Sequence, residues 1–199
     1  MADMFHRQSV ADPAQIRLLS SPVRQELLDT LAALGGIASV AALAEQLGRP
    51  ADGLYYHLRA LVGGGLVEEV ADAQADERRY RIAGEGSAPL RLAYELGPDG
   101  NTEELRLFAR GLLQIAGRDF DEAMRRDGVV VEGARRELWA SRNKGWVSAE
   151  DLEEVNRLLE RLSSLTSQAK EPGREHLTSL AFVLAPVNPR PKRRAPAVG

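Results

Sequence analysis

Glycines and prolines divide the first 85 residues into short segments, and this punctuation constrains the fold more than any other feature of the sequence. Asp12-Pro13 and Ser21-Pro22 each offer a helix cap followed by proline at the first helical position. From Pro22, apolar residues recur at helical spacing until Gly35-Gly36. The pattern predicts an amphipathic helix of about three turns, preceded by another helix start.

Two further helices are predicted with very little chain between them. Ser39 can cap the first, which ends at Gly48, and the second runs from about residue 51 to 62 before three glycines stop it. The second helix places three leucines on one face, as any amphipathic helix does. Two short helices across a glycine-containing turn are typical of a helix-turn-helix.

A β-hairpin is predicted directly after the third glycine. Residues 66–70 fit a strand, 72–76 a polar turn, and 77–82 a returning strand in which arginine alternates with apolar residues. The alternation directs arginine outward, with Arg78 at the tip. Three helices followed at once by a hairpin indicate a winged helix-turn-helix, whose third helix can enter a major groove while the hairpin reaches the flanking backbone.

These segments resemble the ArsR-like winged helix-turn-helix transcriptional regulators of bacteria and archaea over roughly residues 12 to 83. The resemblance implies a dimeric regulator whose recognition helix, here about Ala51 to Val62, reads an operator half-site in double-stranded DNA. It depends on the order and spacing of Ser21-Pro-Val-Arg24, Val40-Ala-Ala-Leu-Ala-Glu-Gln-Leu-Gly48, Leu54-Tyr-Tyr-His-Leu-Arg-Ala-Leu61, Gly65-Leu-Val67 and Arg79-Tyr-Arg-Ile82.

The same resemblance implies which side chains meet DNA. Positions 51, 52, 55 and 56 would face the bases, with His57 and Arg59 nearer the backbone. The full set of candidate DNA-binding residues is Ser39, Ala51, Asp52, Tyr55, Tyr56, His57, Arg59, Arg78, Arg79 and Arg81.

Several of these residues have alternative interpretations. The chain opens its recognition helix with Pro50-Ala-Asp-Gly53 where the family commonly has a serine cap and small polar residues. Because Asp52 repels phosphate, we expect base contacts to fall mainly on Tyr55 and Tyr56. His57 is equally well interpreted as a packing or capping histidine. The hairpin arginines can form a solvated face balanced by glutamates at 68, 69 and 77.

The second half of the chain contains two further predicted helices. The first begins at Thr102, runs to about Asp127 and carries a heptad seam. Such a face must be buried, either on its own winged domain or against a second subunit, and we expect a dimer interface. The seam residues are Leu105, Phe108, Leu112 and Ile115.

Residues 128–187 predict a small α+β appendage. Strands are expected at 129–131 and 177–185, and a helix from 148 to about 168 opens with the spacing of a capping box. Trp139 and Trp146 are expected to lie in its core, with a pocket lining as the alternative. The fold class is therefore mainly α with small β. We divide the chain into an N-terminal arm (1–11), a winged helix-turn-helix domain (12–86), a linker (87–101), a dimerisation and possible effector region (102–187) and a basic disordered tail (188–199).

Composition argues against catalysis. The 199 residues include no cysteine, which excludes disulfides, a cysteine nucleophile and thiolate metal sites. The three histidines lie on unrelated elements, and no phosphate loop or nucleophile motif is present. We expect no catalytic residue, no metal and no cofactor, and with no run of ~20 apolar residues we expect a cytoplasmic protein without a membrane segment.

Charge leaves more than one function open. The last twelve residues carry four cations and no acid, so residues 1–187 hold 22 cations against 29 anions. DNA binding must therefore come from the local placement of arginine. A winged helix that serves only protein association, and a catalytic or ligand-binding protein, are the other classes considered. The sequence leaves open the operator, a possible small-molecule effector, and whether binding represses or activates.

Overall fold

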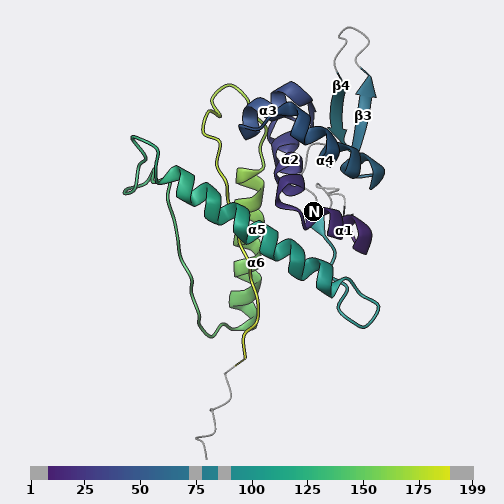
Figure 1. The fold of residues 1–199 in the computed structure, drawn as a ribbon. Helices are drawn as coiled ribbons and strands as arrows, with labels where there is room; N and C mark the ends of the chain where they lie inside the picture. Colours follow the sequence, from purple (N-terminus) through teal and green to yellow (C-terminus); the bar gives the residue numbers. More distant parts are fainter. Residues whose placement is uncertain (1–8, 72–77, 85–90, 189–199) are drawn as a thin grey trace, which may run out of the picture.

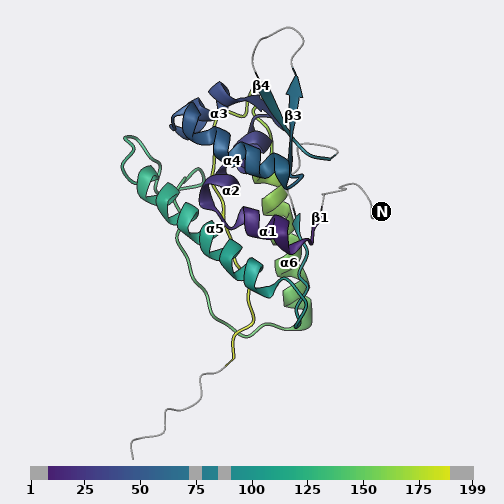
Figure 2. The ribbon, with the colours of Figure 1, turned by 45° about the vertical axis from the view of Figure 1, so that its right-hand side comes forward.

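A computed structural model describes residues 9–71, 78–84 and 91–188. Helices α1 to α4 form one body with a small sheet, and α5 runs beneath α1 and α2 (Figures 1 and 2). This is a winged helix-turn-helix of mainly α class, as predicted. The elements are β1 (Ser9–Val10), α1 (Pro13–Leu19), α2 (Pro22–Ala33), β2 (Ile37–Ser39), α3 (Val40–Leu47), α4 (Ala51–Gly63), β3 (Val67–Ala71), β4 (Arg78–Ile82), β5 (Arg91–Leu92), α5 (Thr102–Ala123) and α6 (Ala149–Thr166).

The predicted caps explain where most of the early helices begin and end. The Asp12 carboxylate accepts the backbone N–H two residues further on at 2.9 Å, and the Ser39 hydroxyl accepts the N–H of Ala42 at 3.2 Å. Ser21 precedes a proline but makes no side-chain cap bond, so of the two predicted start signals of α2 only Pro22 acts as expected. Gly48 ends α3 at a φ of +59°, a left-handed conformation that favours glycine.

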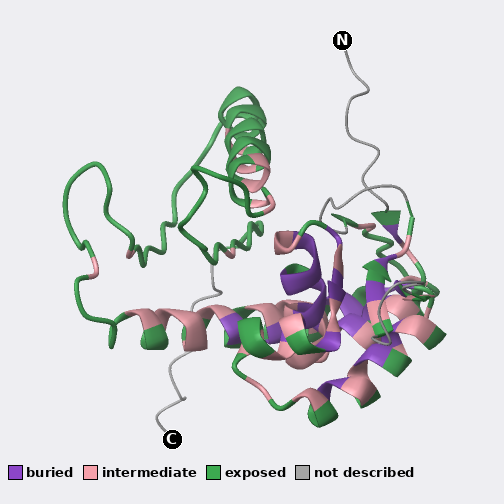
Figure 3. Ribbon diagram, turned by 90° about the horizontal axis from the view of Figure 1, so that it is seen from above, coloured by how far each residue is buried: buried purple, intermediate pink, exposed green. Residues whose placement is uncertain are grey.

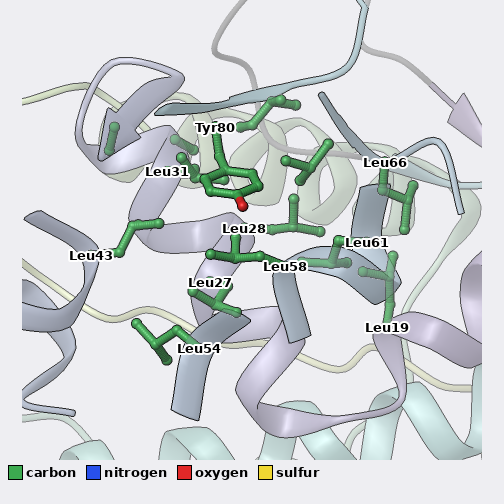
Figure 4. Close-up of a cluster of buried hydrophobic side chains, with 14 of the residues drawn as sticks. Leu19, Leu27, Leu28, Leu31, Leu43, Leu54, Leu58, Leu61, Leu66 and Tyr80 are labelled. Atoms are coloured by element: carbon green, nitrogen blue, oxygen red, sulfur yellow. The ribbon is translucent and has the colours of Figure 1, made fainter. Parts of the chain in front are cut away.

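The core of the winged domain is a leucine cluster built around α2 (Figure 4). Helix α2 contributes Leu27 and Leu31, and α4 contributes its whole predicted apolar face. Tyr80 and Ile82 of β4 close the cluster from the hairpin side, as their alternation with arginine predicts. Burial of each large side chain stabilises the fold by about 1.5–3 kcal/mol.

The sheet contains a strand that the sequence pattern did not predict. Strand β2 pairs antiparallel with β4, which pairs antiparallel with β3, so β4 is central. Three residues are too few to show alternation, which is why this strand escapes sequence reasoning. A second small sheet pairs β1 with β5 in parallel and ties the chain before α1 to the segment before α5.

Helix α5 packs on its own winged domain, contrary to the expectation of a dimer seam. Leu105 belongs to the core cluster and Phe108 packs against it, while Ile115 is also buried. Leu112 is half-buried and lines a hollow beside α2. The apolar seam of α5 is therefore covered by the winged domain of the same chain, which was the alternative to a dimer interface.

A glycine and a glutamine explain this close packing. A Cβ on Gly111 would lie 3.2 Å from the Ser20 carbonyl oxygen and 2.8 Å from the Gln25 amide nitrogen, so only glycine fits without displacing them. The buried Gln25 side chain donates to the carbonyls of Leu19, at 2.5 Å, and Phe108, at 3.2 Å. It therefore joins α1, α2 and α5 through polar contacts inside the core.

Asn101 plays a similar part at the start of α5. The prediction made Thr102 the cap, but Thr102 is the first helical residue, and Asn101 precedes it with its side chain turned inward. Its amide nitrogen donates to the carbonyls of Ala11 and Ala93 at 3.1 and 3.0 Å, and its oxygen accepts the N–H of Glu95 at 3.1 Å. The residue is fully buried.

The α+β appendage expected at 128–187 is not formed in this chain. Residues 129–131 and 177–185 run as irregular chain, because neither lies beside a strand with which it could pair. The helix predicted between them is present as α6, with both bonds of its Ser148–Asp151 capping box. Trp139 and Trp146, expected in a core, are 67% and 94% exposed. The basic tail, apart from residue 188, lies outside the described residues, as do residues 1–8 of the N-terminal arm.

We predict that Asn101→Ala lowers the free energy of unfolding by about 1–3 kcal/mol. The reason is that two carbonyls and one N–H, all part-buried, lose their partner. Chemical denaturation followed by circular dichroism measures the change. Asn143→Ala is the matched control, because Asn143 is exposed and bonds only a serine hydroxyl nearby. Equal stability of the two variants would contradict the role of Asn101.

Candidate nucleic-acid interface

Helix α4 presents a polar face opposite its leucine face. Asp52, Tyr56 and Arg59 lie on the exposed side, and Tyr56 is 69% exposed. Pro50 makes no side-chain cap, so the first N–H groups of α4 receive no bond from the preceding side chain. At the start of α4 the positive end of the helix dipole would therefore attract a DNA phosphate, and the carboxylate of Asp52 would repel it.

The two tyrosines expected to read bases differ in their surroundings. Tyr55 is half-buried and packs against the core, whereas Tyr56 projects into solvent. Tyr55 and Arg59 of α4, with Arg78 and Tyr80 of β4, line one hollow of about 340 Å³ between the helix and the hairpin. We call this the wing hollow. It brings together two of the predicted arginines from separate elements.

The hairpin arginines are partly neutralised by glutamates on the neighbouring strand. Arg81 lies opposite Glu68 in the antiparallel register, and its guanidinium is 2.5 Å from that carboxylate. Arg78 lies 3.4 Å from Glu69. Such exposed pairs contribute about 0–1 kcal/mol, so a phosphate can compete for either arginine. Arg79 is half-buried between β2 and β3. Glu77 and the hairpin turn lie outside the described residues.

His57 is better explained by packing than by phosphate contact. Its ring meets Tyr56 edge to face with 5.3 Å between centroids. Its Nδ1 atom is buried and has no hydrogen-bond partner within the described ranges. Burial lowers the pKa of His57, and the charges of Arg24 and Arg49 lower it further. The imidazole is therefore mainly neutral at pH 7 and offers a phosphate no charge.

The remaining predicted residues support the helix-turn-helix rather than line its outer face. Ser39 caps α3, and Ala51 is half-buried against the core at the start of α4. Sequence reasoning missed Arg49, which lies in the turn between these helices with its guanidinium 3.3 Å from Glu26 of α2. A lone arginine between glycine and proline gave no signal of this partner.

A second hollow, of about 330 Å³, lies between α2, α5, the end of α6 and residues 177–182. Asp29 faces it, together with Glu26 and Asp119. We call it the Asp29 hollow. Arg118 is already paired with Glu26 and lies 3.0 Å from Asp119. The Asp29 carboxyl is itself exposed to the hollow, but desolvation by the surrounding walls, followed by the charges of Glu26 and Asp119, raises its pKa to about 6.

The described residues show no cluster of three or more histidine, cysteine or acidic side chains that could hold a metal ion. Over the same parts of the chain, every helix is too short or too polar to cross a lipid bilayer.

The architecture and the comparisons define the class of domain. A sequence profile of the helix-turn-helix domain family matches residues 19–70, about a quarter of the chain, from the end of α1 into β3. The chain therefore contains a helix-turn-helix domain, a fold through which many proteins bind DNA.

One solved structure similar to this chain is an organohalide-sensing transcriptional regulator in its 2,4-dichlorophenol-bound form. The sequence identity is 15%, the match covers 81% of this chain and 72% of the other, and the TM-score is 0.30. No curated protein sequence matches the chain.

We predict that Asp29 makes stability depend on pH. The native state holds the Asp29 proton more tightly than the unfolded chain, in which an aspartate has a pKa near 3.9. The free energy of unfolding should therefore fall as the pH rises from about 4 through about 6. Asp29→Asn should melt at a higher temperature than the wild type above about pH 6.5, and the difference should vanish near pH 4.

Thermal melts across this pH range test the prediction, and Asp121→Asn, an exposed aspartate of α5, is the control. A constant offset between Asp29→Asn and wild type at every pH would contradict it.

Proposed function

We propose that this protein is a DNA-binding transcriptional regulator of the ArsR-like type. It binds double-stranded operator DNA as a homodimer in the cytoplasm, with α4 in the major groove and the β3–β4 hairpin on the flanking phosphates. The proposal includes no catalytic activity, cofactor or metal.

The wing hollow is the observation that carries this proposal. Arg59 of α4 and Arg78 of β4 line it together, so the helix and the hairpin present positive charge at one shared surface. A winged domain uses these two elements together on DNA, the helix for base edges and the hairpin for phosphates. The exposed ring of Tyr56 lies on the same helix, where it can meet a thymine methyl group or a sugar.

Charge on this surface supports modest affinity for each half-site. Asp52, Glu68 and Glu69 accompany the arginines, so one domain offers little net positive charge. A dimer compensates because two linked half-site contacts raise the effective concentration of the second. This argument favours a two-fold symmetric operator.

The alternative is a winged helix used for protein association without specific DNA binding. The observation that favours it is the pairing of Arg81 with Glu68, which leaves the hairpin mixed in charge. A protein surface rich in paired charges would suit such a hairpin. Salt dependence separates the two functions, because DNA binding releases counterions and weakens steeply as salt rises.

A small-molecule effector would be sought first in the Asp29 hollow. Its walls combine apolar side chains, including Leu112, Ile115 and Phe182, with the carboxyl group of Asp29. Apolar walls with a few polar groups are typical of ligand sites.

If the Tyr56 ring meets a thymine methyl group, we predict that Tyr56→Ala weakens binding to selected operator DNA by about 1–3 kcal/mol and leaves binding to random DNA unchanged. Fluorescence anisotropy on both DNAs measures the effect. Tyr94→Ala is the matched control, since Tyr94 is similarly exposed, at 74%, and lies outside α4 and the hairpin. Equal losses on both DNAs would refute base reading by Tyr56.

We predict that Glu68→Gln strengthens binding to any DNA. The substitution releases Arg81 from its partner and removes a charge that repels phosphate. The slope of log affinity against log salt should steepen by up to about one. Glu103→Gln removes a comparable carboxylate, paired with Arg106 on α5, and should change nothing. An unchanged slope in Glu68→Gln would show that the hairpin does not meet the backbone.

A further inference from the structure

Residues 128–187, which we call the C-terminal arm, expose apolar side chains more than any other described part of the chain. No residue of the arm is buried (Figure 3). Fifteen of the twenty-one large apolar side chains that are exposed among the described residues lie in it, including Trp146 at 94% and Trp139 at 67%. A soluble chain rarely leaves so much apolar surface in water without a partner.

The total accessible surface of the chain also indicates that some of its surface lacks a partner. The chain exposes 15354 Å². A folded protein the size of the described part exposes about 8,100 Å², and the 31 residues outside it could add at most about 4,900 Å² even as fully unfolded chain. About 2,350 Å² remains, an area that one subunit can bury in a large homodimer interface.

The arm meets its own body mainly around the Asp29 hollow, and few polar contacts join them. The backbone N–H of Lys170 donates to the Ala33 carbonyl at 3.0 Å, and the Ser179 hydroxyl donates to Asp119 at 2.6 Å. Helix α6 has no buried residue at all, although leucines recur along one of its faces. A helix of this length is marginally stable in water unless such a face packs on something.

Charge indicates what covers the arm. Residues 135–144 carry four cations and one anion, and residues 150–154, in the first turns of α6, carry four anions. Within the described ranges no ion pair joins these two segments of the same chain, and Arg157 instead neutralises Glu154 inside α6. In a two-fold symmetric pair, the basic segment of each copy can lie on the acidic segment of the other. Both segments then gain oppositely charged partners.

We propose that the arms of two copies pack on each other, with residues 135–144 of one chain lying on α6 of the other. Trp139 and Trp146 are then buried at the interface, beside the apolar face of α6. This inference deepens the dimeric state proposed above and does not depend on DNA binding, so it is tested without DNA.

Tryptophan fluorescence measures the arm directly, because the two tryptophans of the protein both lie in it. In the full-length dimer we expect blue-shifted emission and protection from acrylamide. On dilution both signals should move toward those of the unfolded chain in parallel with dissociation, measured by sedimentation velocity. A dimer with exposed tryptophans, or protected tryptophans in a monomer, would overturn the proposal.

A charge exchange tests the pairing itself. One chain carries Arg135→Glu, Arg136→Glu and Arg142→Glu, and a second carries Glu150→Lys, Glu153→Lys and Glu154→Lys, so that the net charge of each segment changes sign. Each alone should dimerise at least tenfold more weakly than wild type, since like charges then face each other. Mixed, they should form a heterodimer, because both contacts regain opposite charges. Failure of the mixture to associate would overturn the proposal, since contacts within one chain cannot be restored by a second.

An apolar variant completes the test. Leu162→Asp, on α6, should weaken dimerisation at least tenfold and keep the circular dichroism of the winged domain. Leu96→Asp, an exposed leucine before α5, is the control and should remain dimeric. Dimerisation of Leu162→Asp as strong as that of the control would overturn the assignment of α6 to the interface.

Discussion

The packing of α2 against α4 is the contact on which the rest of the winged domain depends. Leu27 and Leu31 are fully buried beside Leu58, and the inner face of α4 is committed to this cluster (Figure 4). The outer face, with Tyr56 and Arg59, is therefore held toward solvent next to the hairpin. A leucine-to-alanine change in this cluster would lower the free energy of unfolding by about 2–5 kcal/mol. It would also disturb the candidate nucleic-acid interface, although no residue of that interface is changed.

Glu26 of α2 connects this core to the turn before α4 and to helix α5. Its carboxylate pairs with Arg49, in the turn before α4, and with Arg118 of α5. The position of α5 is therefore linked by charge to the turn that positions α4. Since the C-terminal arm follows α5 in the chain, the ion pairs of Glu26 would connect the proposed association of the arms to α4, the helix proposed to bind DNA.

Local sequence signals predicted the elements of the winged domain because caps and stops act over a few residues. Ser39, Gly48 and the leucine spacing of α4 identified their helices from the chain alone. The partners of long-range polar groups could not be found this way. Asn101 looked like part of a chain break, yet its amide joins segments 90 residues apart in the chain.

The same limit explains the two errors in the second half. A heptad seam shows that one face of α5 is buried, but the sequence does not say on what, and Gly111 allows the approach to α2 that decided it. An apolar stretch such as 177–185 becomes a strand only beside another strand. In the candidate site, the spacing placed both tyrosines on α4, but only the packing of Tyr55 distinguished it from Tyr56.

Selection of binding sites from random DNA, followed by hydroxyl-radical footprinting on the enriched sequence, tests the central claim most directly. A dimer of winged helix-turn-helix domains should enrich an inverted repeat and protect two patches on one face of the duplex, separated by about one helical turn of 10 base pairs or a multiple of it. Enrichment no greater than that of an unrelated acidic protein, or a footprint without two-fold symmetry, would contradict the account.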